Sequence, residues 1–237
     1  MNNYEYSRLD EISLSAQYSE GMNGRMILHS VQIFSRWILP GSILEMGPAD
    51  GLSTSHLVQL TDDYEVLEGS REFCEILNEK FPTITVHNSI FEEFNPSRTY
   101  RNIVLGHVLE HVDDPDEIVH RCIQWLEPGG RIIAATPNSD SLHRQVAVNA
   151  GIISSVHDLT PTDISIGHRR VINPTQLRSY FEKDQLTINH MGGYYLKSFA
   201  NGQIEDISTP EVRDALMILG EKYFEIAADI YVVATRD

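Results

Sequence analysis

Four histidines in the middle of the chain carry side chains that could move a proton near neutral pH. They are His107, His111, His143 and His168, and the ordinary pKa of a histidine is about 6.5. A reaction that attaches a group to a hydroxyl or an ammonium needs such a base to remove the proton. We therefore expect His107, His111 and His168 to be catalytic; the alternative for each is a structural hydrogen bond.

The spacing of two of these histidines with a glutamate suggests a second kind of chemistry. His107, Glu110 and His111 lie three and four positions apart, so one face of a helix would present all three as metal ligands. His168 could supply a fourth ligand, and nitrogen ligands favour zinc-like metals over Mg²⁺. The alternative is that Glu110 pairs locally and His111 packs under a lid. We adopt this alternative, so the prediction assigns no metal.

A glycine-containing turn predicts a binding site for a cofactor. It lies between a strand expected at 42–46 and a helix expected at 52–60. Glycine is needed where the backbone takes a positive φ or a ligand approaches closely, and open α/β folds bind nucleotides where such a turn follows a strand. The residues of this turn that we expect to hold the cofactor are Glu45, Gly47, Pro48, Ala49 and Gly51.

The pattern of this turn separates three kinds of nucleotide site. A dinucleotide site requires G-x-G-x-x-G, and a P-loop requires a lysine that is absent between Gly41 and Glu79. What remains is acidic-x-G-x-A-x-G, which resembles motif I of the class I S-adenosylmethionine-dependent methyltransferases. The resemblance implies S-adenosylmethionine as cofactor, which has no phosphate and carries a sulfonium cation. Glu45 and Asp50 would tolerate that cation but repel a pyrophosphate.

Three later motifs strengthen the resemblance to methyltransferases, and to the ubiquinone-type branch in particular. They are L-E-H-V at 109–112, L-x-P-G-G at 126–130 and Pro137-Asn138. The resemblance implies that Gly106 and His107 line the methionine end of the cofactor and the transferred methyl. Ubiquinone-type and small-RNA methyltransferases carry a related E-x-x-E-H cluster that binds Mg²⁺, but here His107 replaces the first glutamate.

The ends of the next two strands predict contacts to the nucleoside. Glu68 ends a strand expected at 64–68, where a carboxylate can accept two hydrogen bonds from a ribose diol. The same geometry serves NAD, so an NAD(P)-dependent oxidoreductase stays an alternative, as does a catalytically inactive protein that binds S-adenosylmethionine. The resemblance places adenine beside the segment after the third strand. The remaining cofactor contacts that we expect are Gly69, Asn88, Ser89 and Ile90.

The elements that position these residues alternate between strand and helix. Such alternation predicts right-handed βαβ units and a parallel sheet. The fold class expected is therefore α/β, a Rossmann-like, seven-stranded, mostly parallel sheet with helices on both faces and a helical lid. We expect a helical cap at 1–40, the cofactor-binding core at 41–138, a lid insertion at 139–172, and the rest of the core with a helical insertion at 173–237.

Composition limits the partners of this chain of 237 residues. With 18 basic and 34 acidic residues, its formal charge is −16, which argues against a broad electrostatic contact with nucleic acid or an anionic membrane. Cys74 and Cys122 lack C-x-x-C spacing and indicate reduced core thiols. We therefore expect a cytoplasmic enzyme acting on a small-molecule substrate; a homodimer through an apolar stripe at 208–226 stays open.

Overall fold

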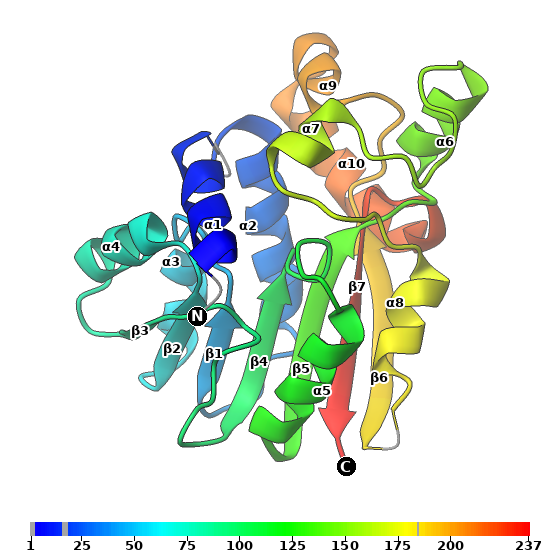
Figure 1. Cartoon of the computed structure of the whole chain (residues 1–237). Helices are drawn as coiled ribbons and strands as arrows, with labels where there is room; N and C mark the ends of the chain where they lie inside the picture. The colour runs from blue at the N-terminus through cyan, green and yellow to red at the C-terminus, as the bar shows by residue number, and fades with distance from the viewer. Residues whose placement is uncertain (1–2, 16–18, 184) are drawn as a thin grey trace.

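The structure is a computed structural model that describes residues 3–15, 19–183 and 185–237. Its centre is a seven-stranded sheet in the order β3-β2-β1-β4-β5-β7-β6 (Figure 1). β7 pairs antiparallel with both of its neighbours, and the other pairs are parallel. The expected fold class is thereby confirmed. The strands are β1 (Ile43–Met46), β2 (Tyr64–Glu68), β3 (Thr85–Asn88), β4 (Tyr100–Gly106), β5 (Leu126–Pro137), β6 (Leu186–Tyr194) and β7 (Asp229–Arg236).

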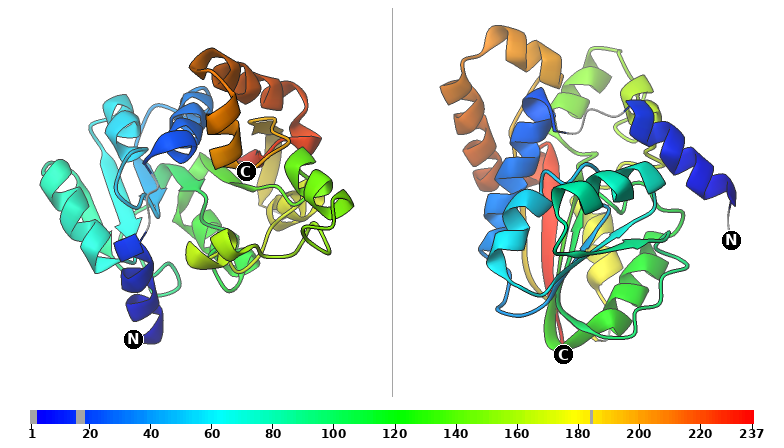
Figure 2. Two further views of the ribbon diagram at one scale, coloured as in Figure 1. Left: turned by 90° about the horizontal axis from the view of Figure 1, so that it is seen from above. Right: turned by 90° about the vertical axis from the view of Figure 1, so that its left-hand side faces the viewer.

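Helices cover both faces of this sheet, and each face has its own buried cluster of apolar side chains. α5 and α8 pack on one face, where Cys122 and Phe181 are fully buried. α2 and α10 pack on the other, where Phe34 and Met217 are buried (Figure 2, right). The helices are α1 (Asn3–Ser15), α2 (Gly21–Ser35), α3 (Thr54–Leu57), α4 (Arg71–Lys80), α5 (Pro115–Trp125), α6 (Leu142–Asn149), α7 (Pro161–Ser165), α8 (Pro174–Phe181), α9 (Asn201–Ile207) and α10 (Pro210–Lys222), with short 3-10 turns η1 (Val58–Leu60) and η2 (Phe224–Ile226).

Local capping residues fix the start of two helices. Ser70 accepts a hydrogen bond from the backbone N–H of Phe73, and Asn173 accepts one from that of Gln176, with Pro174 at the first helical position. The sequence predicts both caps, since Ser70 precedes an amphipathic run at 71–80 and Asn173-Pro174 precedes another at 174–183, and the structure confirms them. The polar pattern of residues 10–20 predicts a short helix. α1 lies nearer the N-terminus than this range, part of which falls on residues 16–18, outside the described residues.

The carboxyl edge of the parallel strands is covered by a layer of short elements. α1, α7 and α9 lie above this edge in Figure 1, and the view from above in Figure 2 shows them around it. The segment expected as a lid, 139–172, contributes α6 and α7; the four-part division of the chain stays a prediction. Among the described helices, none has the length and apolar character that a membrane span requires.

Candidate active site

A cavity of about 600 Å³ opens at the carboxyl edge of the sheet, beneath α1 and α7. This volume lies within the range of sites that hold a small molecule or a cofactor, about 300–1,000 Å³. Most of the residues expected from the sequence line it: Glu45, Gly47, Pro48, Ala49, Glu68, Gly69, Ile90, Gly106, His107, His111 and His168. Gly51, Asn88 and Ser89 are not among the described residues of its wall.

The turn after β1 departs from ordinary backbone geometry at alternate residues. Gly47, Ala49 and Gly51 have φ values of 62°, 51° and 83°, in the left-handed region. A Cβ on Gly51 would lie 2.8 Å from both Leu77 Cδ2 and Phe81 Cε2, so this glycine packs the turn against α4 rather than the cavity. Ala49 adopts the same left-handed backbone conformation although it has a side chain, at a steric cost of about 1–2 kcal/mol. The motif is therefore a tight turn that lines the cavity except at Gly51.

Glu45 is a positioning residue for this turn. Its carboxylate is buried and accepts hydrogen bonds from Ser53 Oγ and Thr54 Oγ1, both at 2.5 Å, and from Tyr64 OH at 2.7 Å. Burial raises the pKa of the Glu45 carboxyl, although the three hydroxyl donors oppose that shift. These bonds join β1 to the start of α3 and to β2. These three hydroxyl donors were not predicted from the sequence. The signal that could have identified two of them is the pair Ser53-Thr54 shortly after the glycine turn.

Glu68 ends β2 with its carboxylate at the cavity wall and only 6% of its surface exposed. The backbone N–H of Ser70 donates to Oε1 at 2.8 Å, and that of Ala49 donates to Oε2 at 3.2 Å. Burial raises the pKa of Glu68 to about 7, with those N–H groups acting against the shift. Each carboxylate oxygen can accept further hydrogen bonds. Glu68 is thus held in place with acceptor capacity left for a ligand.

The segment after β3 faces the cavity through different residues than expected. Asn88 turns its amide toward the β2–α4 loop, where it donates to the carbonyl oxygens of Glu68 and Gly69, both at 3.2 Å. Ser89 donates its hydroxyl to the carbonyl oxygen of Ile90. Ile90 lines the cavity, and its backbone N–H donates a hydrogen bond to the hydroxyl oxygen of Tyr6 at 3.2 Å. The wall here is therefore apolar.

His107 follows β4 with a φ of 60°, so the segment 107–111 is not helical. The expectation that His107, Glu110 and His111 share one helical face is wrong, because the left-handed residue redirects the chain into turns. His107 Nδ1 lies 3.2 Å from Glu110 Oε1 and Nε2 lies 2.9 Å from Tyr194 OH. Burial alone would lower the pKa of His107, but the hydrogen bond and charge of Glu110 raise it. The same contact lowers the pKa of Glu110, against the effect of burial.

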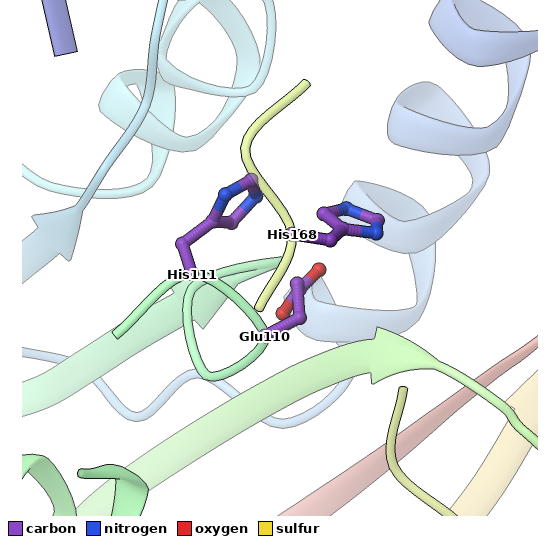
Figure 3. Close-up of side chains that lie close together, drawn as sticks. All are labelled: Glu110, His111 and His168. Carbon is purple, nitrogen blue, oxygen red and sulfur yellow. The ribbon is translucent and has the colours of Figure 1, made fainter. Parts of the chain in front are cut away.

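Glu110, His111 and His168 converge although 57 positions separate the two histidines (Figure 3). One potential ligand atom from each lies within 4.8 Å of those of the other two. The two imidazole rings meet edge to face, with their centroids 4.8 Å apart. Burial lowers the pKa of His111 to about 4, so this imidazole is unprotonated at neutral pH; the carboxylate of Glu110 opposes the shift. Two of the three expected catalytic histidines are therefore neighbours.

Two buried charged residues of the cavity wall were not anticipated from the sequence. Asp229, the first residue of β7, is 2% exposed, and its Oδ2 has no hydrogen-bond partner among the described residues. Lys197 is 9% exposed and donates to Asn201 Oδ1 at 2.6 Å. Burial raises the pKa of Asp229 to about 6 and lowers that of Lys197 to about 8. The only local signal was an aspartate preceding an apolar last strand.

The basic residues of the lid act within the protein. Arg169 donates to the carbonyl oxygen of His111 at 2.7 Å and pairs with Glu5 of α1 at 2.8 Å. Arg170 donates to the carbonyl oxygen of Val112 at 2.8 Å, and Arg144 pairs with a lid aspartate. These bonds tie the lid to the loop after β4 and to the N-terminal helix, above the cavity.

Known proteins share both the sequence pattern and the fold of this chain. The profile of a family described as "Methyltransferase domain" matches residues 22–190, well over half of the chain. The chain belongs to the class I S-adenosylmethionine-dependent methyltransferases. A curated relative, the ubiquinone biosynthesis O-methyltransferase of Salmonella newport (strain SL254), is 25% identical over 111 residues. That match spans 44% of this chain and 42% of the relative, less than half the length of the curated protein.

Solved methyltransferases share the fold across nearly the whole chain. An S-adenosylmethionine-dependent methyltransferase from Mesorhizobium loti is 16% identical with a TM-score of 0.65, covering 91% of this methyltransferase and all of that protein. The N-methyltransferase NodS from Bradyrhizobium japonicum WM9, solved with S-adenosyl-L-homocysteine, is 12% identical with a TM-score of 0.62 over 98% and 97% of the two chains. At such identities these likenesses concern the fold alone.

Proposed function

We propose that this methyltransferase transfers a methyl group from S-adenosylmethionine to a small-molecule acceptor, with oxygen or nitrogen as the acceptor atom. The observation that carries the proposal is Glu68. A buried carboxylate, oriented by two backbone N–H groups at the end of β2, faces the cavity beside the turn at Gly47. That arrangement suits a ribose diol.

The cavity can be divided between the cofactor and the acceptor. We assign the ribose to Glu68, the adenine to Gly69 and Ile90, and the methionine end to the Gly47–Ala49 turn with Gly106. Gly47 fits this role because it lines the cavity with a φ of 62° and has no side chain to keep a ligand from its backbone. The acceptor then lies toward the loop after β4 and the start of β7.

The chain's own residues align the reactants and handle the proton. When bound, S-adenosylmethionine supplies a methyl group on an activated sulfonium, so alignment and exclusion of water account for much of the rate. His107 positions its neighbours and does not accept a proton in the reaction, because the hydrogen bond and charge of Glu110 keep its imidazole protonated. His111 and His168 remain the proposed bases, since the lowered pKa of His111 keeps that imidazole free to take a proton. An oxygen or ammonium acceptor would lose its proton to one of them.

Calorimetry tests the choice of cofactor directly. We expect S-adenosylmethionine and S-adenosylhomocysteine to bind with one site per chain and NAD⁺ and NADPH not to bind at about 1 mM. Incubation with methyl-labelled S-adenosylmethionine and a panel of phenols, catechols and amines then identifies the acceptor class. A chain that bound NAD⁺ instead would contradict the proposal. The fold also argues against NAD⁺, because the order β5-β7-β6 at one edge of the sheet departs from the dinucleotide-binding strand order.

Two further parts of the proposal rest on composition and pattern. A net charge of −16 supports a small molecule rather than a nucleic acid as substrate. We propose a cytoplasmic location from the same composition.

A homodimer stays a prediction: α10 leaves Ile218 62% exposed and Val212 48% exposed. Light scattering of the purified protein measures the oligomeric state.

A further inference from the structure

Two oppositely charged side chains of the cavity wall have no ion-pair partner among the described residues. Lys197 follows β6 and Asp229 begins β7, and both side chains are buried where they line the cavity. The ammonium of Lys197 donates to Asn201 Oδ1 at 2.6 Å, and Asp229 Oδ2 has no hydrogen-bond partner. The two groups attract each other electrostatically, but no ion pair within 4.0 Å joins them.

The neighbouring charges at this end of the cavity are already paired with one another. Arg144 Nη1 lies 3.3 Å from a carboxylate oxygen of Asp163. His107 Nδ1 lies 3.2 Å from a carboxylate oxygen of Glu110. These contacts balance two positive and two negative charges within the protein itself. The ammonium after β6 and the carboxylate of β7 are therefore free to pair with a ligand.

Both groups keep their charge at neutral pH although they are buried. Burial lowers the pKa of Lys197 to about 8 and raises that of Asp229 to about 6, so each is mainly ionised at pH 7. The positive charges of His107 and Lys197 oppose the shift at Asp229. A buried charge without a paired partner costs free energy. A ligand that brings the opposite charge to each group would recover that free energy.

The order of the strands places Lys197 and Asp229 on the acceptor side of the cavity. We assign the ribose and the adenine to residues at the end of β2 and after β3, and the methionine end to the ends of β1 and β4. β7 lies two strands beyond β4 in the sheet (Figure 1). At the usual spacing of strands this is about 10 Å. The pair is therefore offset from the proposed cofactor contacts.

We propose that Lys197 and Asp229 bind an α-amino acid group of the methyl acceptor, with Lys197 holding its carboxylate and Asp229 its ammonium. The inference rests on the proposed function and names the class of acceptor for the same cavity. The ammonium of the ligand can donate to both carboxylate oxygens of Asp229, and its carboxylate can accept the protons of Lys197 that Asn201 leaves free. A ligand with a single charge would leave one of the two buried groups unpaired. The methyl is received by another part of the acceptor, so the role proposed for His111 and His168 is unchanged.

Calorimetry of the full chain tests the site in two steps. S-adenosylhomocysteine is titrated first, and the saturated chain is then titrated with each standard α-amino acid at up to about 10 mM. Saturation fills the place of the cofactor's own methionine, which carries the same group. We expect at least one amino acid to bind. The strongest should bind about tenfold or more tightly than both the amine that lacks its carboxylate and the acid that lacks its ammonium.

The two site variants should each lose the recognition of one half of the ligand. Lys197→Met should weaken the amino acid about tenfold or more and bind the amine as the parent chain does. Asp229→Asn should weaken the amino acid to a similar extent and bind the acid as the parent chain does. Lys222→Met and Asp206→Asn are matched controls, because they remove exposed charges outside the cavity wall. A purely structural role would weaken all of these ligands alike, S-adenosylhomocysteine included.

Circular dichroism confirms that each variant is folded, and Lys197→Gln replaces Lys197→Met if that variant is not. The inference is overturned if no amino acid binds the saturated chain, or if the amine or the acid binds as tightly as the amino acid. It is also overturned if Lys197→Met mainly weakens S-adenosylhomocysteine, because the pair would then belong to the cofactor. A parent chain that does not bind S-adenosylhomocysteine contradicts the proposed function instead. The amino acids are then titrated into the free chain, and the same comparisons decide.

Discussion

Protonation of Glu68 should control the affinity for the cofactor. In the protein alone, burial raises the pKa of this carboxyl to about 7. A ribose diol donates two hydrogen bonds. Only the ionised carboxylate has both oxygens free to accept them, because protonation turns one oxygen into a donor. Binding should therefore strengthen as the pH rises through 7, and it should release a proton below that pH.

The magnitude follows from the titration curve. With a pKa of about 7, the ionised fraction of Glu68 rises from about 0.09 at pH 6 to about 0.9 at pH 8. The affinity for S-adenosylhomocysteine should therefore increase about tenfold over this range. Glu68→Gln removes the charge from both hydrogen bonds at a cost of about 1.5–3 kcal/mol, or about 10- to 150-fold in affinity. The variant should also lose the pH dependence.

The same carboxyl gives an independent readout in the stability of the free protein. Its pKa is raised from 4.5 in the unfolded chain to about 7 in the folded one. A raised carboxyl pKa contributes stability that is complete below pH 4.5 and is lost as the pH rises through 7. The free energy of unfolding should therefore fall by up to about 3 kcal/mol more in the parent chain than in Glu68→Gln over this interval.

Calorimetry at several pH values, in buffers of different ionisation enthalpy, measures both the affinity and the released proton. Asp62→Asn is the matched control, because it removes an exposed carboxylate just before the same strand. Urea unfolding of the same three proteins gives the stability. An affinity that stays constant from about pH 6 to 8, together with a Glu68→Gln variant within twofold of the parent, would refute the reasoning.

Four other substitutions test the site. Gly51→Ala should lower the free energy of unfolding by about 2 kcal/mol in urea, since φ is 83° and its Cβ would clash with α4, whereas Ala49→Gly should change it by less than about 1 kcal/mol. Leu9→Ala removes an apolar side chain that lies against Gly69 in the cavity wall, so calorimetry should show about tenfold weaker binding of S-adenosylhomocysteine. Tyr194→Phe removes the hydroxyl 2.9 Å from His107 and should cost about 1 kcal/mol of stability and part of the turnover; an unchanged rate would contradict the positioning role of His107.

The parts of the fold that could be predicted are those encoded locally. The strand that ends in Glu68 and the caps at Ser70 and Asn173 each depend on a few adjacent residues, and the structure has them as expected. The apolar run at 131–136 predicts a strand, but β5 begins earlier, at Leu126, because Leu126 pairs with Tyr100 across an irregularity in the ladder. That pairing joins residues 26 positions apart, so no local pattern contains it.

The part of the cavity wall that could be predicted is the part that local sequence determines. Residues at the carboxyl ends of β1 and β2 had to meet at one edge once the sheet was parallel. Asp229 was missed because its place depends on β7 running antiparallel, which brings the start of that strand to the same edge as the ends of the others. Lys197 follows β6 and reaches the cavity only through the turn before α9. Neither side chain belongs to a local motif.

The histidines show why residue type alone could not assign the proton chemistry. His107 and His111 are four positions apart, yet the pKa of the first is raised and that of the second is lowered to about 4. The difference comes from neighbours. Glu110 bonds directly to His107, whose other nitrogen meets Tyr194 from β6, whereas burial dominates at His111, whose ring lies edge to face with that of His168. A single positive φ at His107 decides which ring faces the glutamate. Because that backbone conformation is rare outside glycine, helical spacing could not predict it, and only the folded chain brings His168 beside His111.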